Sequence, residues 1–146
     1  MSSDITFSCR SISDGRGEGA AVISKDALCM ALVDAKTGIV HEKGHDLDGR
    51  CIAGRVLVMP TGKGSSVVQA DGLYRLIEHG TAPTAVIIER PEPVLVSTII
   101  AMEVPLVDTV DRGFYEAVAE GDYLTVDAGA EKILLRKTGA HEGSGA

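Results

Sequence analysis

The middle of the chain holds a run of apolar, mostly β-branched residues that leads through a glycine-rich loop into an amphipathic segment. Residues 55–60 read RVLVMP, a continuous run typical of a strand that is buried on both faces of a sheet. Apolar residues then recur at helical spacing from Val67 to Ile77, and Gly80 stands where such a helix is expected to end. A buried strand joined to a helix by a short loop predicts an α/β fold.

Shorter periodic segments on both sides of this unit predict further strands and a second helix. Strands are expected at residues 5–9, 20–23, 30–33, 39–41, 85–88, 106–110, 121–126 and 132–136. Residues 94–102 are expected to be helical because they lie between two predicted strands, and residues 15–19, GRGEG, to form a flexible turn. The pattern predicts a mixed, largely parallel central sheet flanked by helices and additional β-strands. We expect a single domain over residues 1–137 and a disordered Gly/Ser-rich tail over residues 138–146.

The composition is that of a globular protein whose main partner is not nucleic acid. Of the 146 residues, 45% are hydrophobic, which is enough to bury a core without disulfides or metals. The net charge of −7 and the lack of a basic stripe argue against nucleic-acid binding. The longest apolar run, residues 94–102, is too short to span a bilayer, and the first residues lack the pattern of a signal peptide. A cytoplasmic protein is expected.

The cysteines and histidines do not have the spacing of a metal site. Cys9, Cys29 and Cys51 are widely separated and form no CxxC pair, so we expect reduced cysteines and no metal site in this chain. His41 and His45 would suit a metal only on a helix, and a glycine between them argues against a helix. A polar loop is expected at these histidines.

The loop after the central strand is the segment best suited to bind an anion. It lies at the carboxyl end of a buried strand, where ligands bind in open α/β sheets. It also lies at the start of a helix, where backbone N–H groups and the helix dipole favour negative charge. Gly62 and Gly64 allow the backbone to approach a ligand, Lys63 adds a positive charge, and Ser65 and Ser66 bring hydroxyls.

The residues of this loop leave three interpretations open. The first is a capped helix with a solvated lysine, since Ser66 and Gln69 have the spacing of a capping box. The second is a nucleotide P-loop, which is disfavoured because Gly64 separates Lys63 from Ser65 and the earlier glycine of that motif is missing. The third is a carboxylate or phosphate site with a reactive serine.

A longer pattern around the loop resembles a known family. Residues 49–66 read GRCIAGRVLVMPTGKGSS and fit the pattern G-x-x-x-x-G-R-V-L-V-x-P-x-G-K-G-S. Together with residues 80–83 and 105–108, this pattern is similar to the small subunit, or swivelling domain, of the aconitase X family. The resemblance covers the chain from about residue 15 to residue 127.

One segment departs from the family pattern. A glycine is expected near the end of residues 94–104, where this chain has Ala101, Met102 and Glu103. The departure concerns the local packing of that segment and leaves the resemblance intact.

The resemblance implies a swivelling β/β/α fold and an active site shared with a larger chain. In this superfamily a serine removes a proton from the carbon next to the substrate carboxylate, and the corresponding residue here is Ser65. Gly62, Lys63, Gly64 and Ser66 are the expected substrate-binding residues, with Lys63 as the local cation that stabilises the serine alkoxide. An iron–sulfur cluster is expected to be bound by the large subunit and not by this chain.

The resemblance leaves the substrate open between two compounds, cis-3-hydroxy-L-proline and (R)-mevalonate 5-phosphate. The composition, rich in Ala and Gly and poor in Lys, is not typical of a thermophile and favours the hydroxyproline reaction. A phosphate would require further basic residues that the sequence does not reveal. We therefore expect the small subunit of a heterodimeric hydroxyproline dehydratase, with a mevalonate 5-phosphate dehydratase as the alternative. A non-catalytic anion-binding or interaction module is the alternative of another class.

Four polar residues are left without an assigned role. Arg16 lies in the glycine-rich stretch near the N-terminus, and Arg90 follows a predicted strand at the sheet edge expected for the Ser65 loop. His41 and His45 lie in the predicted polar loop.

Overall fold

A mixed eight-stranded sheet organises the chain, with its strands in the order β1-β8-β7-β3-β4-β5-β6-β2. The computed structural model describes residues 4–63 and 66–137. β3, β4, β5 and β6 pair in parallel, and the remaining neighbours pair antiparallel. The strands are β1 (Ile5–Ser8), β2 (Arg10–Ser13), β3 (Arg16–Ile23), β4 (Val56–Met59), β5 (Ala85–Ile88), β6 (Leu106–Asp108), β7 (Tyr123–Asp127) and β8 (Lys132–Arg136). The predicted α/β class, with a parallel centre and additional strands, is confirmed.

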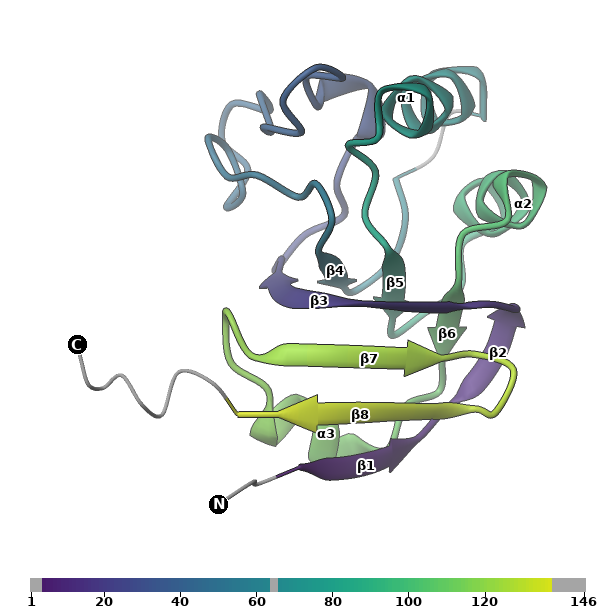
Figure 1. Cartoon of the computed structure of the whole chain (residues 1–146). Helices are drawn as coiled ribbons and strands as arrows, with labels where there is room; N and C mark the ends of the chain where they lie inside the picture. The colour runs from purple at the N-terminus through teal and green to yellow at the C-terminus, as the bar shows by residue number, and fades with distance from the viewer. Residues whose placement is uncertain (1–3, 64–65, 138–146) are drawn as a thin grey trace.

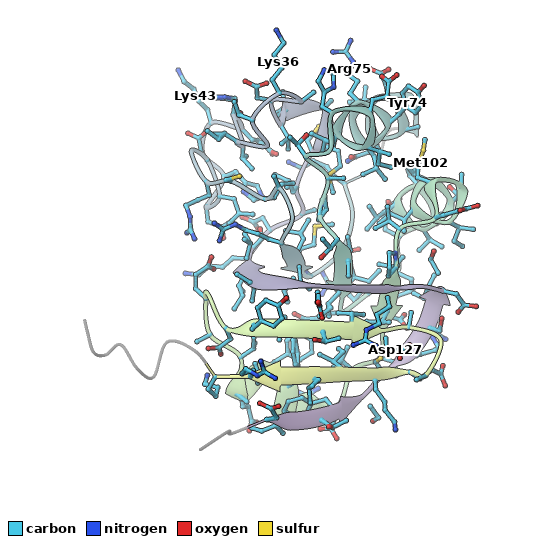
Figure 2. The ribbon with its side chains drawn as sticks, in the orientation of Figure 1. Lys36, Lys43, Tyr74, Arg75, Met102 and Asp127 are labelled. Atoms are coloured by element: carbon cyan, nitrogen blue, oxygen red, sulfur yellow. The ribbon has the colours of Figure 1, made fainter. Side chains whose placement is uncertain are left out.

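The two longer helices, α1 (Ser66–His79) and α2 (Pro93–Met102), cover one side of the parallel strands (Figure 1). The short helix α3 (Arg112–Ala117) lies on the other side, where its Phe114 belongs to the opposite core. A short 3-10 helix, η1, spans Met30–Leu32. Figure 1 shows α1 and α2 above the parallel strands, the helical layer, and β7, β8 and β1 below them, the antiparallel layer, with α3. Figure 2 shows Lys36 and Arg75 extending outward from the helical layer, whereas Asp127 lies in the antiparallel layer. This is the three-layer arrangement implied by the resemblance.

β3 belongs to both layers of strands. Its first part, residues 16–20, pairs antiparallel with β7, and its last part, residues 21–23, pairs parallel with β4. The sheet therefore turns from one layer into the other along a single strand. No helix in the described part of the chain is long and apolar enough to cross a membrane.

Two cores lie on opposite sides of the parallel strands. In β4, Leu57 and Met59 belong to the core beneath the helical layer, whereas Val56 and Val58 belong to the core against the antiparallel layer. All four side chains are buried. This burial on both faces is the physical reason for the continuous apolar run in the sequence.

The two cores contain different kinds of large side chain. Met30 and Met59 lie in the core beneath the helical layer, and Met102 packs against it. Phe7 and Phe114 lie in the other core, with ring centroids 5.6 Å apart in an edge-to-face arrangement. Flexible methionines thus fill the space under the helices, and rigid rings fill the space between the strand layers.

Several local predictions are confirmed and others are wrong. The central strand, the two longer helices and the strand at 132–136 stand where the pattern put them. Residues 30–33, predicted as a strand, contain the 3-10 helix instead, and residues 39–41 make only isolated bridges, Val33 with Val40 and Ile39 with Cys51. α3 was not predicted. The predicted tail, residues 138–146, lies outside the described residues.

The glycine-rich stretch near the N-terminus is a strand and not the predicted flexible turn. A Cβ on Gly17 would lie 2.1 Å from the carbonyl oxygen of Thr84, and one on Gly19 would lie 2.4 Å from that of Gly54. These glycines let β3 pass close to two other backbone segments, which is a recognised use of glycine within strands. Gly17 and Gly19, which suggested a flexible turn in the sequence, are needed because β3 packs closely against other backbone segments.

The departure from the family pattern after α2 also has a backbone explanation. Glu103 is the C-cap of α2 and has φ 60° and ψ 34°, in the left-handed region. Glycine adopts this conformation without strain and is the usual residue there. Of the three residues that stand where a glycine was expected, Glu103 thus has the conformation that glycine favours.

Replacement of Gly17 by Ala is expected to lower the free energy of unfolding by about 2 kcal/mol or more, because the added methyl group meets a carbonyl oxygen. The measurement is chemical denaturation of the purified chain. Gly129→Ala is the matched control, since the nearest atom to its added Cβ is 3.9 Å away. Equal stability of the two variants would contradict the close approach.

Replacement of Glu103 by Gly is expected to raise the free energy of unfolding by about 0.5–1 kcal/mol, because it relieves the left-handed strain. Ala101→Gly, two residues earlier and within α2, is expected to lower it by a similar amount, about 0.5–1 kcal/mol. Denaturation curves of both variants test the opposite signs. A loss of stability in both would argue against a strained cap.

Candidate active site

The loops at the carboxyl ends of the parallel strands meet at one edge of the sheet. The loop after β4, which begins at Pro60, contacts the loop after β5, because the Pro60 carbonyl accepts hydrogen bonds from the backbone N–H groups of Glu89 (3.0 Å) and Arg90 (2.9 Å). Arg90 thus lies beside the predicted loop, at the sheet edge where open α/β sheets bind ligands.

Gly62 is buried against the start of α2. A Cβ at this position would lie 2.4 Å from the Cβ of Leu95 and 3.0 Å from the Oε1 of Glu92. Glu92 caps α2 by accepting from the backbone N–H groups of Val94 (3.1 Å) and Leu95 (2.9 Å). The sequence suggested that Gly62 allows a ligand to approach, and the structure adds that the protein's own packing requires a glycine here.

Lys63 is paired with a carboxylate that sequence analysis did not single out. Its Nζ donates a hydrogen bond to Oε2 of Glu42, whose Oε1 accepts from the backbone N–H of Cys29 at 3.0 Å. The hydrogen bond to Glu42 raises the pKa of Lys63. Burial acts to raise the pKa of Glu42, but the hydrogen bonds from Lys63 and Cys29 outweigh it, and the net pKa is lowered. Both groups therefore carry charge near neutral pH, and the lysine charge is already matched by a carboxylate.

Gln69 holds the same loop from the other side. Its Nε2 donates to the carbonyl of Lys63 at 2.7 Å, and its Oε1 accepts from the backbone N–H of Met30 at 3.0 Å. Only 1% of Gln69 is exposed. The side chain suggested as part of a capping box thus connects the Lys63 loop to η1.

The predicted base is not among the residues that the structure describes. Ser65 and Gly64 lie outside the described residues, while Lys63 and Ser66, the first residue of α1, lie on either side of them. Sequence reasoning missed Glu42 and Gln69 as partners of this loop. No local signal could have identified Glu42, since 21 residues separate it from Lys63.

Three further cations follow the carboxyl ends of the parallel strands. Lys25 comes after β3, Arg90 after β5 and Arg112 after β6, and all three are exposed. Within the ranges 4–63 and 66–137 none of them is recorded in an ion pair. Exposed carboxylates at Asp26, Glu89 and Asp111 stand beside these cations, so the sheet edge that carries the predicted loop holds charges of both signs.

A pocket of about 500 Å³ lies at the ends of β5 and β6, and Glu89, Arg112 and Tyr115 are among its lining residues. The Tyr115 hydroxyl is buried and has no hydrogen-bond partner among the residues that the structure places. Burial, with smaller contributions from Glu89 and Asp108, raises the pKa of Tyr115. This phenol therefore remains protonated and is available as a hydrogen-bond donor.

The side chains of His41, His45 and Arg16 are not part of this candidate site. His45 is buried, its Nδ1 accepts from the backbone N–H of Leu47 at 3.0 Å, and its Nε2 lies 3.0 Å from the carbonyl of Ala27. These contacts hold the His45 ring within its loop. His41 is exposed. Arg16 begins β3 and so lies at the opposite end of that strand from the carboxyl edge.

The cysteines do not form a cluster site. Cys9 is buried, Cys29 and Cys51 are half-buried, and all three are free thiols. Across the described part of the chain, no group of three or more His, Cys, Asp or Glu side chains is arranged to hold a metal ion. These residues do not fit an iron–sulfur cluster.

Comparison with known proteins identifies the family. Residues 6–135 match the model of a family described as the aconitase X swivel domain. The chain belongs to the aconitase X swivel-domain family. The resemblance drawn from residues 49–66 is therefore confirmed.

Relatives of this aconitase X swivel domain carry the name of one dehydratase. The phosphomevalonate dehydratase small subunit of Methanosarcina acetivorans is 42% identical over 129 residues, which cover 88% of this chain and 89% of the relative. That of Thermococcus kodakarensis is 34% identical over 131 residues, covering 89% and 96%. A crystal structure of Thermococcus kodakaraensis aconitase X in its holo-form matches with a TM-score of 0.79 at 32% identity, covering 90% of this chain and 98% of that chain. The chain is thus a small subunit of a dehydratase, a hydro-lyase.

Cys9 is expected to react with iodoacetamide at pH 8 much more slowly than Cys29 and Cys51 do. Burial, with the nearby carboxylates of Glu131, Asp108 and Asp127, raises the pKa of Cys9 to about 11. Its smaller thiolate fraction slows alkylation by about a hundred-fold relative to an ordinary cysteine. Mass spectrometry of the labelled chain measures the rates, and labelling in guanidinium, where all three should react alike, is the control. Alkylation of Cys9 at the rate of Cys29 in the folded chain would contradict this assignment.

Proposed function

We propose that this chain is the small subunit of a phosphomevalonate dehydratase and that Ser65 is its general base. The observation that carries the proposal is the likeness, along nearly the whole chain, to small subunits of that name. The geometry supports it, since the predicted loop joins the carboxyl end of a buried parallel strand to the start of α1.

In this proposal Ser65 removes the proton from the carbon next to the substrate carboxylate. The C–H electrons form the new double bond, and the hydroxyl on the neighbouring carbon leaves, so that one molecule of water is released overall. A serine hydroxyl is a weak base in water, but the positive end of the α1 dipole stabilises a nearby alkoxide. The charge of Lys63 is already matched by Glu42. In this scheme Lys63 therefore contributes mainly through its place in the loop and less as a free cation.

A larger partner subunit completes the active site in this proposal. The iron–sulfur cluster expected for the family is assigned to that partner, since the described residues of this chain do not fit such a cluster. The heterodimer and its cytoplasmic location, like the single-domain boundary at residue 137, remain predictions.

The choice of substrate rests on the names of the relatives and on the charges at the sheet edge. The hydroxyproline expectation rested on composition and on the lack of visible phosphate-binding residues. Lys25, Arg90 and Arg112 now provide exposed cations at the edge that carries the loop. (R)-Mevalonate 5-phosphate brings a doubly charged phosphate that such cations attract, whereas the protonated ring nitrogen of cis-3-hydroxy-L-proline is a cation that they repel.

The assay is reconstitution of the chain with its large subunit and measurement of water elimination from each of the two compounds. Turnover of (R)-mevalonate 5-phosphate and none of cis-3-hydroxy-L-proline is expected. The reverse preference would overturn the substrate assignment and leave the dehydratase assignment intact. Inactivity of each separate subunit is the control for shared catalysis.

Ser65→Ala in the reconstituted enzyme is expected to lower kcat by roughly 10²–10⁴-fold, because the base is removed. Size-exclusion chromatography should show that the complex still assembles. Ser97→Ala is the matched control, since this serine is exposed on α2 and its hydroxyl bonds only to the helix backbone at Pro93 and Val94. Near-normal turnover of the Ser65 variant would eliminate the assignment of the base.

A further inference from the structure

Two buried polar side chains, Glu42 and Gln69, hold opposite sides of one residue in the loop. Glu42 binds the Nζ of Lys63, and Gln69 binds its carbonyl oxygen at 2.7 Å. Glu42 is only 9% exposed and Gln69 only 1%. Lys63 is therefore fixed both by its side chain and by its backbone.

Each of these two side chains also accepts a hydrogen bond through its Oε1 atom, from the backbone N–H groups of two consecutive residues. Glu42 accepts from the N–H of Cys29 and Gln69 from the N–H of Met30, each at 3.0 Å. Residues 29 and 30 form the start of η1, which packs on α1. The two side chains thus form a double bridge between Lys63 and the start of η1, which we call the loop clamp.

The loop clamp joins three segments that are distant in sequence. Glu42 comes from the loop that follows η1, Gln69 from the first turns of α1, and Lys63 from the loop after β4. Burying a carboxylate and an amide away from water is unfavourable unless each finds partners, and here each makes two hydrogen bonds. A helix start needs only a capping side chain, so this arrangement exceeds what α1 alone requires.

We propose that Glu42 and Gln69 are positioning residues of the dehydratase, which fix Lys63 and the first turns of α1, the described parts of the chain that flank Ser65 in the sequence. This inference rests on the proposed function, in which Ser65 is the base. Lys63 directly precedes the Gly64–Ser65 pair, and Gln69 lies four residues after Ser65, so the clamp holds the chain on both sides of the serine. A catalytic group must be held within about 0.5 Å of its productive position, and a displacement of about 1 Å lowers rates by roughly 10²-fold.

The test uses variants that keep the shape of each side chain. Glu42→Gln removes the charge that pairs with Lys63, and Gln69→Glu replaces the N–H donor that holds the Lys63 carbonyl with an acceptor. Asp46→Asn is the matched control, because Asp46 lies in the same loop as Glu42 and accepts from the backbone N–H of Lys25 (2.8 Å) without contacting Lys63. All three are measured as complexes with the large subunit.

Glu42→Gln and Gln69→Glu are each expected to lower kcat by roughly 10–100-fold with KM changed less than about threefold, because geometry and not substrate affinity is lost. The double variant is expected to be little worse than the slower single variant, since both substitutions release the same residue. Asp46→Asn should keep its kcat. Amide hydrogen exchange over residues 60–70 should be faster in both clamp variants than in Asp46→Asn.

Three outcomes separate the possibilities. If the two clamp variants keep normal kcat and normal exchange, the positioning role is refuted. If Asp46→Asn loses as much kcat as they do, in step with lowered thermal stability, the clamp is only a stabilising contact and the inference is again refuted. If Ser65→Ala keeps turnover in the same assay, the proposed function itself fails, whatever the clamp variants do.

Discussion

The shared strand β3 is the constraint on which the rest of the structure depends. Its backbone pairs with β7 along one part and with β4 along the other, so one strand fixes both strand layers relative to each other. Two glycines make this possible, because Gly17 and Gly19 let β3 pass against carbonyl oxygens that any side chain would displace. Once β3 is fixed, β4, β5 and β6 follow in parallel, and their carboxyl ends form the edge that carries the loop before α1.

At that edge the protein uses polar contacts where the rest of the fold uses apolar burial. The strands beneath the loop are buried on both faces, but the loop itself is held by Glu42, Gln69 and the Pro60 carbonyl. Hydrogen bonds are directional, so they fix orientation more narrowly than apolar contacts do. In the proposed function a base on one subunit acts in a site that a partner completes, and such control would keep its geometry through the assembly of two chains.

Local patterns in the sequence predicted much of the local structure, although they missed α3 and the 3-10 helix at Met30–Leu32. Contacts between distant segments account for two further misses, the strand at Gly17 and the Glu42–Lys63 pair. The continuous apolar run and the helical spacing after it were sufficient for β4 and α1, and the family pattern identified the loop between them. The strand at Gly17 was missed because glycine indicates flexibility unless its neighbours in space are known. The Glu42–Lys63 pair was missed because nothing near Glu42 in sequence refers to Lys63. Arg90 was already expected at the sheet edge from the sequence, but Lys25 and Arg112 were recognised there only when the strand order was known.

The uneven distribution of methionine and phenylalanine between the two cores provides built-in spectroscopic reporters. Met30, Met59 and Met102 belong to the core beneath the helices, and Phe7 and Phe114 to the core between the strand layers. The methyl resonances of Met30, Met59 and Met102 therefore sense the side of the sheet that bears α1, and the ring resonances of Phe7 and Phe114 sense the opposite side. An NMR titration with a partner subunit can thus assign a perturbation to one layer or the other in the native sequence, without any introduced probe.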